Sequence, residues 1–295
     1  MAVKTWFITG TSRGFGREWA TAALDRGDEV AATARDVASL DDLAAKYGER
    51  ILPIPLDVTD RDADFAAVKL AHDYFGRLDV IVNNAGYGQF GMVEEISEAE
   101  IRAQLETNLL GALWITQAAL PYLREQGSGH IMQVSSIGGI SAFTNTGAYH
   151  ASKWALEGLS QSLAAEVAGF GISVTLIEPT GYATDWAGSS AKHATPLPAY
   201  EQVREQAAQA RARRFTPGDP SATRDAVLML VDIPNPPLRL FLGEAPLGIA
   251  TADYESRLAT WREWQPVAAA AQGHDGKTER TSGRTDSGGR PAHGG

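Results

Sequence analysis

The sequence predicts an α/β protein in which helices cover both faces of a parallel sheet of about seven strands. Three observations support this fold class. Short apolar runs alternate with helical stretches along most of the chain, which is typical of a doubly wound sheet. The first apolar run leads through a glycine-rich turn into a helix. The chain has 295 residues, of which 44% are hydrophobic and 21% charged, so it can bury a sizeable core.

The predicted elements follow one another as strand and helix from the N-terminus onward. Short runs rich in β-branched and aromatic residues predict strands at 4–9, 29–33, 51–56, 79–83, 130–135, 173–178 and 239–242. Longer stretches between them predict helices at 15–26, 61–75, 98–125 and 149–168. The crossovers are expected to be right-handed, as parallel connections nearly always are.

We expect residues 1–267 to form one domain, with an insertion and a tail that depart from this alternation. Residues 182–216 carry Tyr, Trp, Pro and several Arg without strand periodicity, which predicts a lid over the strand ends. Residues 250–265 have the pattern of an amphipathic helix that caps the domain or a partner subunit. Residues 268–295 are poor in large apolar groups and are predicted to be disordered, as a solvated extension or a regulatory segment.

Charge and cysteine content exclude several classes of protein. The formal net charge of −10 argues against nonspecific binding to nucleic acid. The absence of cysteine excludes disulfides and thiolate metal sites, and no metal site is assigned. No apolar run approaches the roughly 18 residues that span a membrane, and the N-terminus runs into a strand pattern without a charged-then-apolar leader. The sequence therefore predicts a cytoplasmic protein that acts on a small molecule.

A glycine-rich loop, TGTSRGFG at 9–16, joins the first predicted strand to the first predicted helix. Gly10, Gly14 and Gly16 stand where a dinucleotide-binding loop needs a tight turn, a close approach of the backbone to pyrophosphate, and close packing of helix on strand. The helix N-terminus then presents free N–H groups to the phosphates. The spacing differs from G-x-G-x-x-G, and an ordinary strand–helix turn is the alternative at this point.

The end of the second predicted strand indicates the cofactor. In sites for NAD an acidic residue there bonds the ribose, whereas a 2′-phosphate needs a cation. Here Ala34 is followed by Arg35, and Arg13 of the glycine loop supplies a second guanidinium, which favours NADP(H). The alternative is that both arginines are surface charges, and Asp36 lies close by. Asp57 is placed to bond the adenine amino group, or to cap a helix.

Tyr149 and Lys153 are four residues apart on a predicted helix, so their side chains share one face. A phenol can donate a proton to a carbonyl if its pKa falls from about 10 towards neutrality, which a neighbouring ammonium and an oxidised nicotinamide both favour. Lys153 can also hold the nicotinamide ribose. Ser136 ends the fifth strand, where its hydroxyl can bond the carbonyl oxygen. A helix-surface pair is the alternative for a Tyr-x-x-x-Lys match by itself.

With these residues in place, the sequence resembles the short-chain dehydrogenase/reductase family, in its branch with a single Rossmann-fold domain of about 250 residues. The resemblance covers residues 3–245, through the loop at 9–16 with Ser12, Asp57, NNAG at 83–86, Asn108, Ser136 and YHASK at 149–153. It implies a catalytic tetrad of Asn108, Ser136, Tyr149 and Lys153, with a water held by the asparagine that relays protons to the lysine. It also implies that Asn84 and Gly86 support the turn under the adenine ring, and that Tyr149 and Lys153 contact the cofactor.

The chain departs from the family pattern after the sixth strand. The family usually has Pro-Gly there, with Thr five residues beyond the Pro, whereas this chain has Pro179, Thr180 and Gly181. The spacing from Pro179 to Thr184 is kept, so Thr184 is expected to bond the nicotinamide carboxamide. The close backbone approach at Thr180 is the feature this substitution puts in question.

The expected substrate is an apolar or aromatic ketone or aldehyde. Segments 89–93, 137–143 and 182–216 are expected to line the pocket, or to pack the core, through Phe90, Met92, Phe143, Tyr182 and Trp186. Arg211, Arg213 and Arg214 are taken as a solvated helix face, with contact to an anionic substrate group as the alternative.

The expected activity is that of an NADP(H)-dependent dehydrogenase/reductase acting on CH–OH groups. A non-catalytic nucleotide-sensing protein on the same fold is one alternative. An epimerase or an enzyme working in the direction of alcohol oxidation in a biosynthetic pathway is another. The helices at 98–125 and 149–168 are those through which members of the family often form homodimers or homotetramers.

Overall fold

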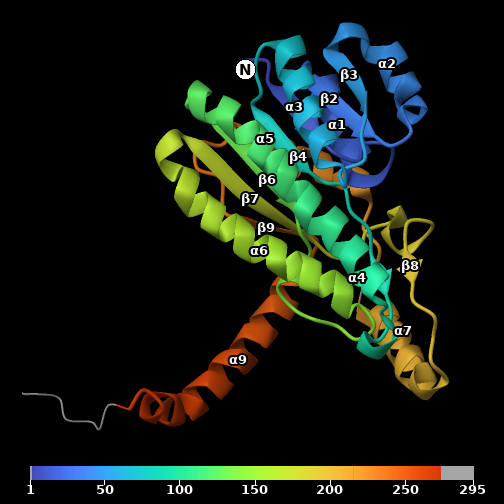
Figure 1. Cartoon of the computed structure of the whole chain (residues 1–295), viewed down its shortest axis with the longest axis vertical. Coiled ribbons are helices and arrows are strands. Elements are labelled where there is room, and N and C mark those ends of the chain that lie inside the picture. The colour runs from blue at the N-terminus through green and yellow to red at the C-terminus, as the bar shows by residue number, and fades with distance from the viewer. Residues whose placement is uncertain (1, 215, 274–295) are drawn as a thin grey trace, which may run out of the picture. The chain divides into compact units, whose positions relative to one another are not determined.

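The computed structural model describes residues 2–214 and 216–273, and its centre is a parallel sheet of seven strands (Figure 1). The strand order is β3-β2-β1-β4-β6-β7-β9, so the order reverses direction between β1 and β4. This confirms the predicted doubly wound sheet. The strands are β1 (Thr5–Ile8), β2 (Glu29–Ala34), β3 (Ile51–Pro55), β4 (Val80–Asn83), β6 (Gly129–Val134), β7 (Ile172–Pro179) and β9 (Arg239–Leu242), with a separate short pair of β5 (Gln89–Phe90) and β8 (Lys192–His193).

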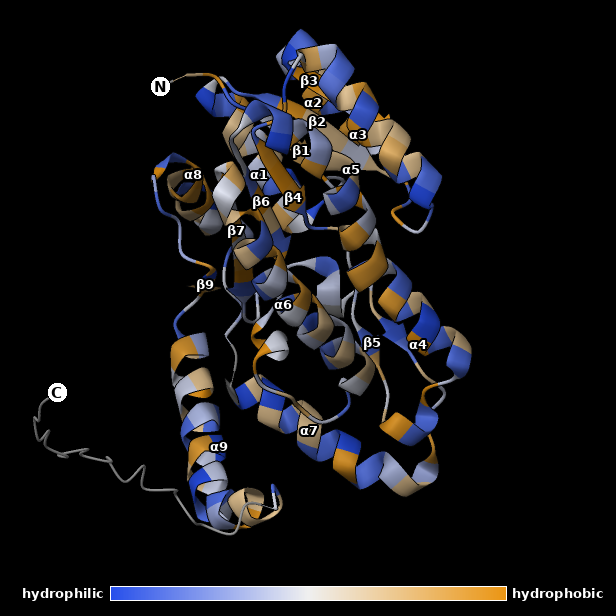
Figure 2. Cartoon of the chain, turned by 60° about the vertical axis from the view of Figure 1, so that its left-hand side comes forward, coloured by the Kyte–Doolittle hydropathy of each residue, from blue (hydrophilic) through white to orange (hydrophobic). Residues whose placement is uncertain are grey.

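Helices connect the strands and pack on both faces of the sheet (Figures 1 and 2). They are α1 (Gly14–Arg26), α2 (Asp41–Tyr47), α3 (Arg61–Phe75), α4 (Glu98–Leu105), α5 (Gly111–Gln126), α6 (Gly147–Val167), α7 (Glu201–Arg214), α8 (Arg224–Asp232) and α9 (Ala245–Ala270).

The alternation of side chains along β1 builds two apolar layers. Trp6 and Ile8 pack with α1, α2 and α8 on one face, while Phe7 packs with α3, α5 and α6 on the other. All three side chains are fully buried. Because both faces are covered, the central strands are mainly apolar, and β4 is largely orange in the hydropathy view (Figure 2).

Two predicted segments differ from the structure. The single helix expected at 98–125 is interrupted by a π-helical turn, Glu106–Leu110, which separates α4 from α5 and carries Asn108. Such one-turn π segments are common at functional sites. The segment 182–216, expected to lack strands, contains β8, which pairs in parallel with β5, and also the helix α7.

The C-terminal part of the chain starts a second compact unit at Ala252, inside α9. The helix predicted at 250–265 is therefore present, and its capping role stays a prediction, as does the domain limit at residue 267. The tail expected to be disordered from residue 268 is helical as far as Ala270, and residues 274–295 lie outside the described part. Among the described residues, no helix combines the length and apolar character that a bilayer span requires.

Candidate active site

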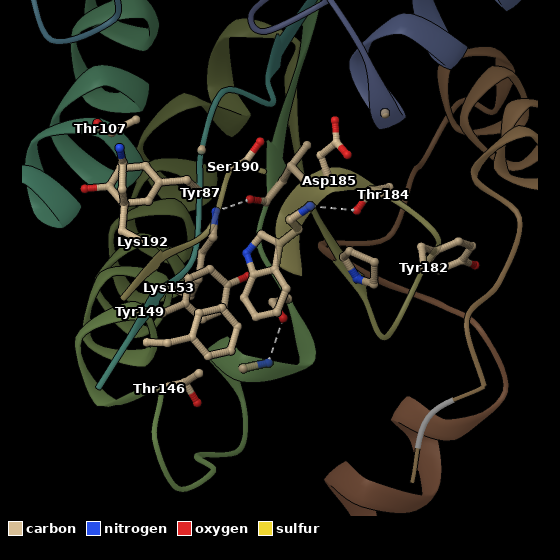
Figure 3. Close-up of a pocket in the computed structure, with 18 of the residues that line it drawn as sticks. Tyr87, Thr107, Thr146, Tyr149, Lys153, Tyr182, Thr184, Asp185, Ser190 and Lys192 are labelled. Carbon is tan, nitrogen blue, oxygen red and sulfur yellow. Dashed lines mark hydrogen bonds between the residues drawn. The ribbon is translucent and has the colours of Figure 1, made fainter. Parts of the chain in front are cut away.

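The carboxyl ends of the central strands open onto a cavity of about 990 Å³. Its lining runs from the glycine loop after β1 to helix α7, and includes residues that follow β2, β4, β6 and β7. Figure 3 shows part of this lining, with Tyr149 and Lys153 side by side. Open α/β sheets bind ligands at this edge, where the strand order reverses.

The glycine loop has the shape that a dinucleotide requires. Gly10 and Gly14 have φ of 70° and 59°, in the left-handed region that favours glycine. A Cβ on Gly16 would lie 2.5 Å from the carbonyl oxygen of Gly10 and 2.5 Å from Nδ2 of Asn84. That amide donates to the carbonyl oxygens of Thr9 (2.9 Å) and Gly10 (3.0 Å). Asn84 therefore supports the glycine loop through two hydrogen bonds, while its expected place under the adenine ring stays a prediction.

The end of β2 presents a cation rather than a carboxylate to the cavity. Ala34 is buried, and Arg35 is exposed and lines the cavity. Asp36 lies outside the lining, and its carboxylate accepts the backbone N–H of Ala38 at 3.2 Å, which caps the next turn. The carboxylate of Asp36 is thereby engaged by the backbone of the turn that it caps.

Asp57 also lines the cavity, in the position predicted for contact with adenine. Its carboxylate accepts the backbone N–H and the hydroxyl of Thr59, at 3.1 Å and 2.9 Å. The alternative role of Asp57 as a helix cap is wrong, because Asp60 caps α3 by accepting from the backbone of Asp62 and Ala63.

Arg13 joins the glycine loop to the segment after β7. Its guanidinium pairs with the carboxylate of Asp185 at 2.8 Å and donates to the hydroxyls of Ser189 (3.1 Å) and Ser190 (2.7 Å). The side chains of Arg13 and Asp185 are each about half exposed. The cation assigned to a 2′-phosphate is therefore in contact with the predicted lid.

Three of the four proposed catalytic residues converge in the cavity. Tyr149 and Lys153 lie one turn apart on α6, with Nζ of Lys153 5.9 Å from the centre of the tyrosine ring. The hydroxyl of Ser136 forms a hydrogen bond with Tyr149 and accepts the backbone N–H of Gly138 at 3.0 Å. The neighbouring Ser135 is buried, and its Oγ has no hydrogen-bond partner in the described part of the chain.

Burial and neighbouring groups act on the pKa of Tyr149 in opposite directions. Burial raises the pKa of Tyr149 to about 12, although the hydrogen bond with Ser136 and the charge of Arg211 both act to lower it. The ammonium of Lys153 donates to the carbonyl oxygen of Val134 at 2.7 Å. Burial also lowers the pKa of Lys153 to about 8. The protein residues alone therefore do not acidify the phenol. The expected acidification included an oxidised nicotinamide, and for that complex it stays a prediction.

Asn108 lies behind this group, on the π-helical turn. Its Oδ1 accepts the backbone N–H of Tyr87 at 3.1 Å, and its Nδ2 donates to the carbonyl oxygen of Tyr87 and to Ser152 Oγ. A Cβ on Gly86 would lie 3.1 Å from Oδ1 of Asn108 and 3.8 Å from Nζ of Lys153. Gly86 thus leaves the space in which the asparagine and the lysine approach each other.

The segment after β7 departs from the family pattern as the sequence indicated. Pro179, Thr180 and Thr184 all line the cavity. The hydroxyl of Thr180 is buried without a partner among the described residues. The methyl group of Thr184 lies 3.6 Å from the position of a Cβ on Gly14, which brings this segment against the glycine loop.

Aromatic side chains form the remaining wall. The ring of Trp186 lies 4.8 Å from that of Tyr149 and 5.3 Å from that of Phe90. Phe143 and Tyr182 also line the cavity, whereas Met92, expected with them, is buried away from it.

Sequence reasoning missed His150, which shapes the loop carrying Ser136. Its Nδ1 lies 2.8 Å from the carbonyl oxygen of Gly138, and its Nε2 accepts the backbone N–H of Phe143 at 2.9 Å. These two bonds define a neutral ring, consistent with a pKa that burial lowers. The sequence shows that His150 is next to Tyr149, but it does not show that its ring bonds Gly138 and Phe143 in the preceding loop.

Known proteins share this architecture. The family model for short chain dehydrogenases matches residues 4–195. The chain is 44% identical to Oxidoreductase BOA17 of Botryotinia fuckeliana over 273 residues, which cover 91% of this chain and 99% of that protein. A short-chain dehydrogenase structure from Streptomyces avermitilis has 39% identity and a TM-score of 0.86, covering 92% of this chain and 98% of that one. An alcohol dehydrogenase from Thermococcus sibiricus, complexed with 5-hydroxy-NADP, has 27% identity and a TM-score of 0.68, covering 82% and 96%.

The doubly wound sheet and the cavity at its carboxyl edge define a nucleotide-binding α/β protein. The chain belongs to the short-chain dehydrogenase family, and it is an oxidoreductase of that family.

Proposed function

We propose that this protein is an NADP(H)-dependent oxidoreductase that interconverts a carbonyl group and an alcohol on a small, partly apolar molecule. One observation carries the proposal. Tyr149 is hydrogen-bonded to Ser136, lies one helical turn from Lys153, and lines the same cavity as the glycine loop. A proton donor and a hydrogen-bond donor thus meet beside a site shaped for a dinucleotide.

The residues of the chain have distinct roles in this reaction. A bound nicotinamide supplies the hydride. Tyr149 donates its hydroxyl proton to the carbonyl oxygen, and the Ser136 hydroxyl donates a hydrogen bond to the same oxygen. The charged form of Lys153, which predominates below a pKa of about 8, stabilises the phenolate that remains.

Asn108 is assigned to the proton relay on the strength of the family resemblance. Its Oδ1 accepts one hydrogen bond from the backbone of Tyr87 and has a second lone pair. Because Gly86 lies close to both Asn108 and Lys153, a water held there would be within reach of the lysine.

Several features favour NADP(H) over NAD(H). Arg13 and Arg35 line the cavity, whereas the carboxylate of Asp36 lies outside it and accepts a hydrogen bond from the backbone of Ala38. Two guanidinium groups suit the geometry and charge of a 2′-phosphate. The Thermococcus sibiricus alcohol dehydrogenase, a structural relative, was solved with a derivative of NADP, which also supports this choice.

The test is Tyr149→Phe, which removes the proton donor and keeps the ring. With NADPH and a panel of ketones and aldehydes, kcat should fall by about a thousandfold, in the range that positioned acids and bases contribute. Binding of NADPH, followed by its fluorescence, should persist. Tyr122→Phe is the matched control, because Tyr122 lies outside the cavity and stacks on His72. Retention of most activity by Tyr149→Phe would refute the assignment.

A further inference from the structure

The cavity is more basic than the chain as a whole. The described residues that line it include two carboxylates, Asp57 and Asp185, and six lysines and arginines. The whole chain has the opposite balance, with 36 acidic and 26 basic residues. The proposed contacts with cofactor phosphates account for Arg13 and Arg35. They do not account for the arginines that line the opposite end of the cavity, on α7.

Two arginines of α7 line that other end, and they differ in their partners. Arg204 is bonded to the buried carboxylate of Glu95, with contacts of 2.5 Å and 3.1 Å. Arg211 lies seven residues, or about two turns, further along the same helix. It makes no ion pair or hydrogen bond to any residue in 2–214 or 216–273. Arg204 therefore holds the helix in place, whereas the charge of Arg211 is uncompensated.

The guanidinium of Arg211 is held over aromatic rings. Its Cζ lies 4.9 Å from the centre of the Trp186 ring and 5.5 Å from that of Phe90. Stacking on these faces orients the group and leaves the N–H edge free for a ligand. Burial opposes its charge, and the principal electrostatic partner that favours the charge is Tyr149. A half-buried cation without an anion is costly unless a ligand supplies one.

Trp186 supplies an aromatic ring to this part of the cavity. Its indole Nε1 is buried on the side of Gly88, where a Cβ on that glycine would lie 3.1 Å from it. The same ring contacts Tyr149, so a molecule whose carbonyl reaches the Tyr149 hydroxyl passes along the indole towards Arg211. Both Arg211 and Arg213 were expected on a solvated helix face. Arg213 is exposed, whereas Arg211 is only partly exposed and lines the cavity.

We propose that Arg211 binds a carboxylate of the substrate, so that the enzyme acts on oxo acids in which an apolar segment separates the carbonyl from the acid. This inference rests on the proposed function, because it takes the carbonyl to lie at Tyr149. A planar carboxylate matches the two parallel N–H bonds of a guanidinium. The aromatic wall of Phe90 and Trp186 packs the apolar segment.

The experiment compares aryl oxo acids with their primary amides. Pairs such as 4-acetylbenzoate and 4-acetylbenzamide, with increasing numbers of carbons between ketone and acid, are titrated calorimetrically into the protein saturated with NADP+. The same pairs are then assayed with NADPH for kcat/KM. The variants are Arg211→Gln, Arg211→Lys and the control Arg213→Gln, an exposed arginine on the same helix.

For at least one pair the wild type should prefer the acid by about tenfold or more, the size expected of a charge-assisted hydrogen bond. Arg211→Gln should bring the acid-to-amide ratio close to one, Arg211→Lys should keep part of it, and Arg213→Gln should keep all of it. A wild type without preference across the set, or a preference that survives in Arg211→Gln, overturns the proposal. Binding of the acid that depends on Arg211 without reduction of any pair would instead refute the proposed function.

Discussion

The contact between Arg13 and Asp185 predicts that the lid competes with NADPH for one guanidinium. In the structure Arg13 pairs with Asp185 at 2.8 Å, and both side chains are about half exposed, at 48% and 47%. If Arg13 binds a 2′-phosphate, this pair must loosen first. Replacing Asp185 with Asn removes the competing charge and keeps the shape of the side chain.

The magnitude follows from the exposure of the pair. Ion pairs in such surroundings contribute roughly 0.2–1 kcal/mol, because water screens them and two side chains lose freedom. Since about 1.4 kcal/mol corresponds to a tenfold change in affinity, Asp185→Asn should tighten NADPH binding by up to about fivefold. Binding of NADH should change little, because NADH lacks the 2′-phosphate.

The assay is a fluorescence titration of NADPH and NADH against the wild type, Asp185→Asn, Arg13→Gln and the double variant. In the cycle, the gain from Asp185→Asn should vanish when Arg13 is already absent. An unchanged affinity for NADPH would refute the reasoning. So would an equal gain in the Arg13→Gln background, since the effect would then come from loss of a negative charge rather than from release of Arg13.

Two other predictions follow from single side chains. Arg35→Asp should weaken NADPH relative to NADH by about tenfold or more, whereas Arg102→Asp, at an exposed site outside the cavity, should leave the ratio unaltered; an unchanged ratio in Arg35→Asp would contradict the cofactor assignment. Asp64 is fully buried without a partner among the described residues, and burial raises its pKa to about 8. Its folded-state pKa lies above the unfolded value, so its stabilising contribution is fully present below the unfolded pKa of about 4 and is lost as pH rises from there to about 8. The free energy of unfolding should therefore fall relative to that of Asp64→Asn between pH 5 and 9, by a total of about 4 kcal/mol; parallel pH profiles in chemical denaturation would rule this out.

The departures from the sequence-based expectations have local physical causes. The helix at 98–125 was predicted as continuous because its apolar spacing gives no sign of the extra residue in the π-helical turn at Asn108. Burial raises the pKa of the Tyr149 phenol in the protein alone, an effect that the spacing of Tyr149 and Lys153 does not reveal. Met92 was expected in the pocket because it is a large apolar residue in a segment near the cavity, but its side chain is buried in the core.

The sequence by itself determined the features that depend on neighbours along the chain. The alternation of Trp6, Phe7 and Ile8 places side chains on both faces of a strand, and the four-residue spacing of Tyr149 and Lys153 places them on one face of a helix. The glycines of the loop predict a tight turn, and Gly10 and Gly14 adopt the positive φ that such a turn allows glycine. These are consequences of backbone geometry, so they are legible without knowledge of the fold.

Only the tertiary structure decided which distant groups meet. Arg211 was grouped with Arg213 and Arg214 as a solvated face, and only the packing of α7 over β5 residues and Trp186 brings its charge against the cavity. Likewise, nothing in the sequence pairs Arg13 with Asp185, which are far apart along the chain. Such contacts depend on how loops cross the end of the sheet, and residue periodicity carries no information about that path.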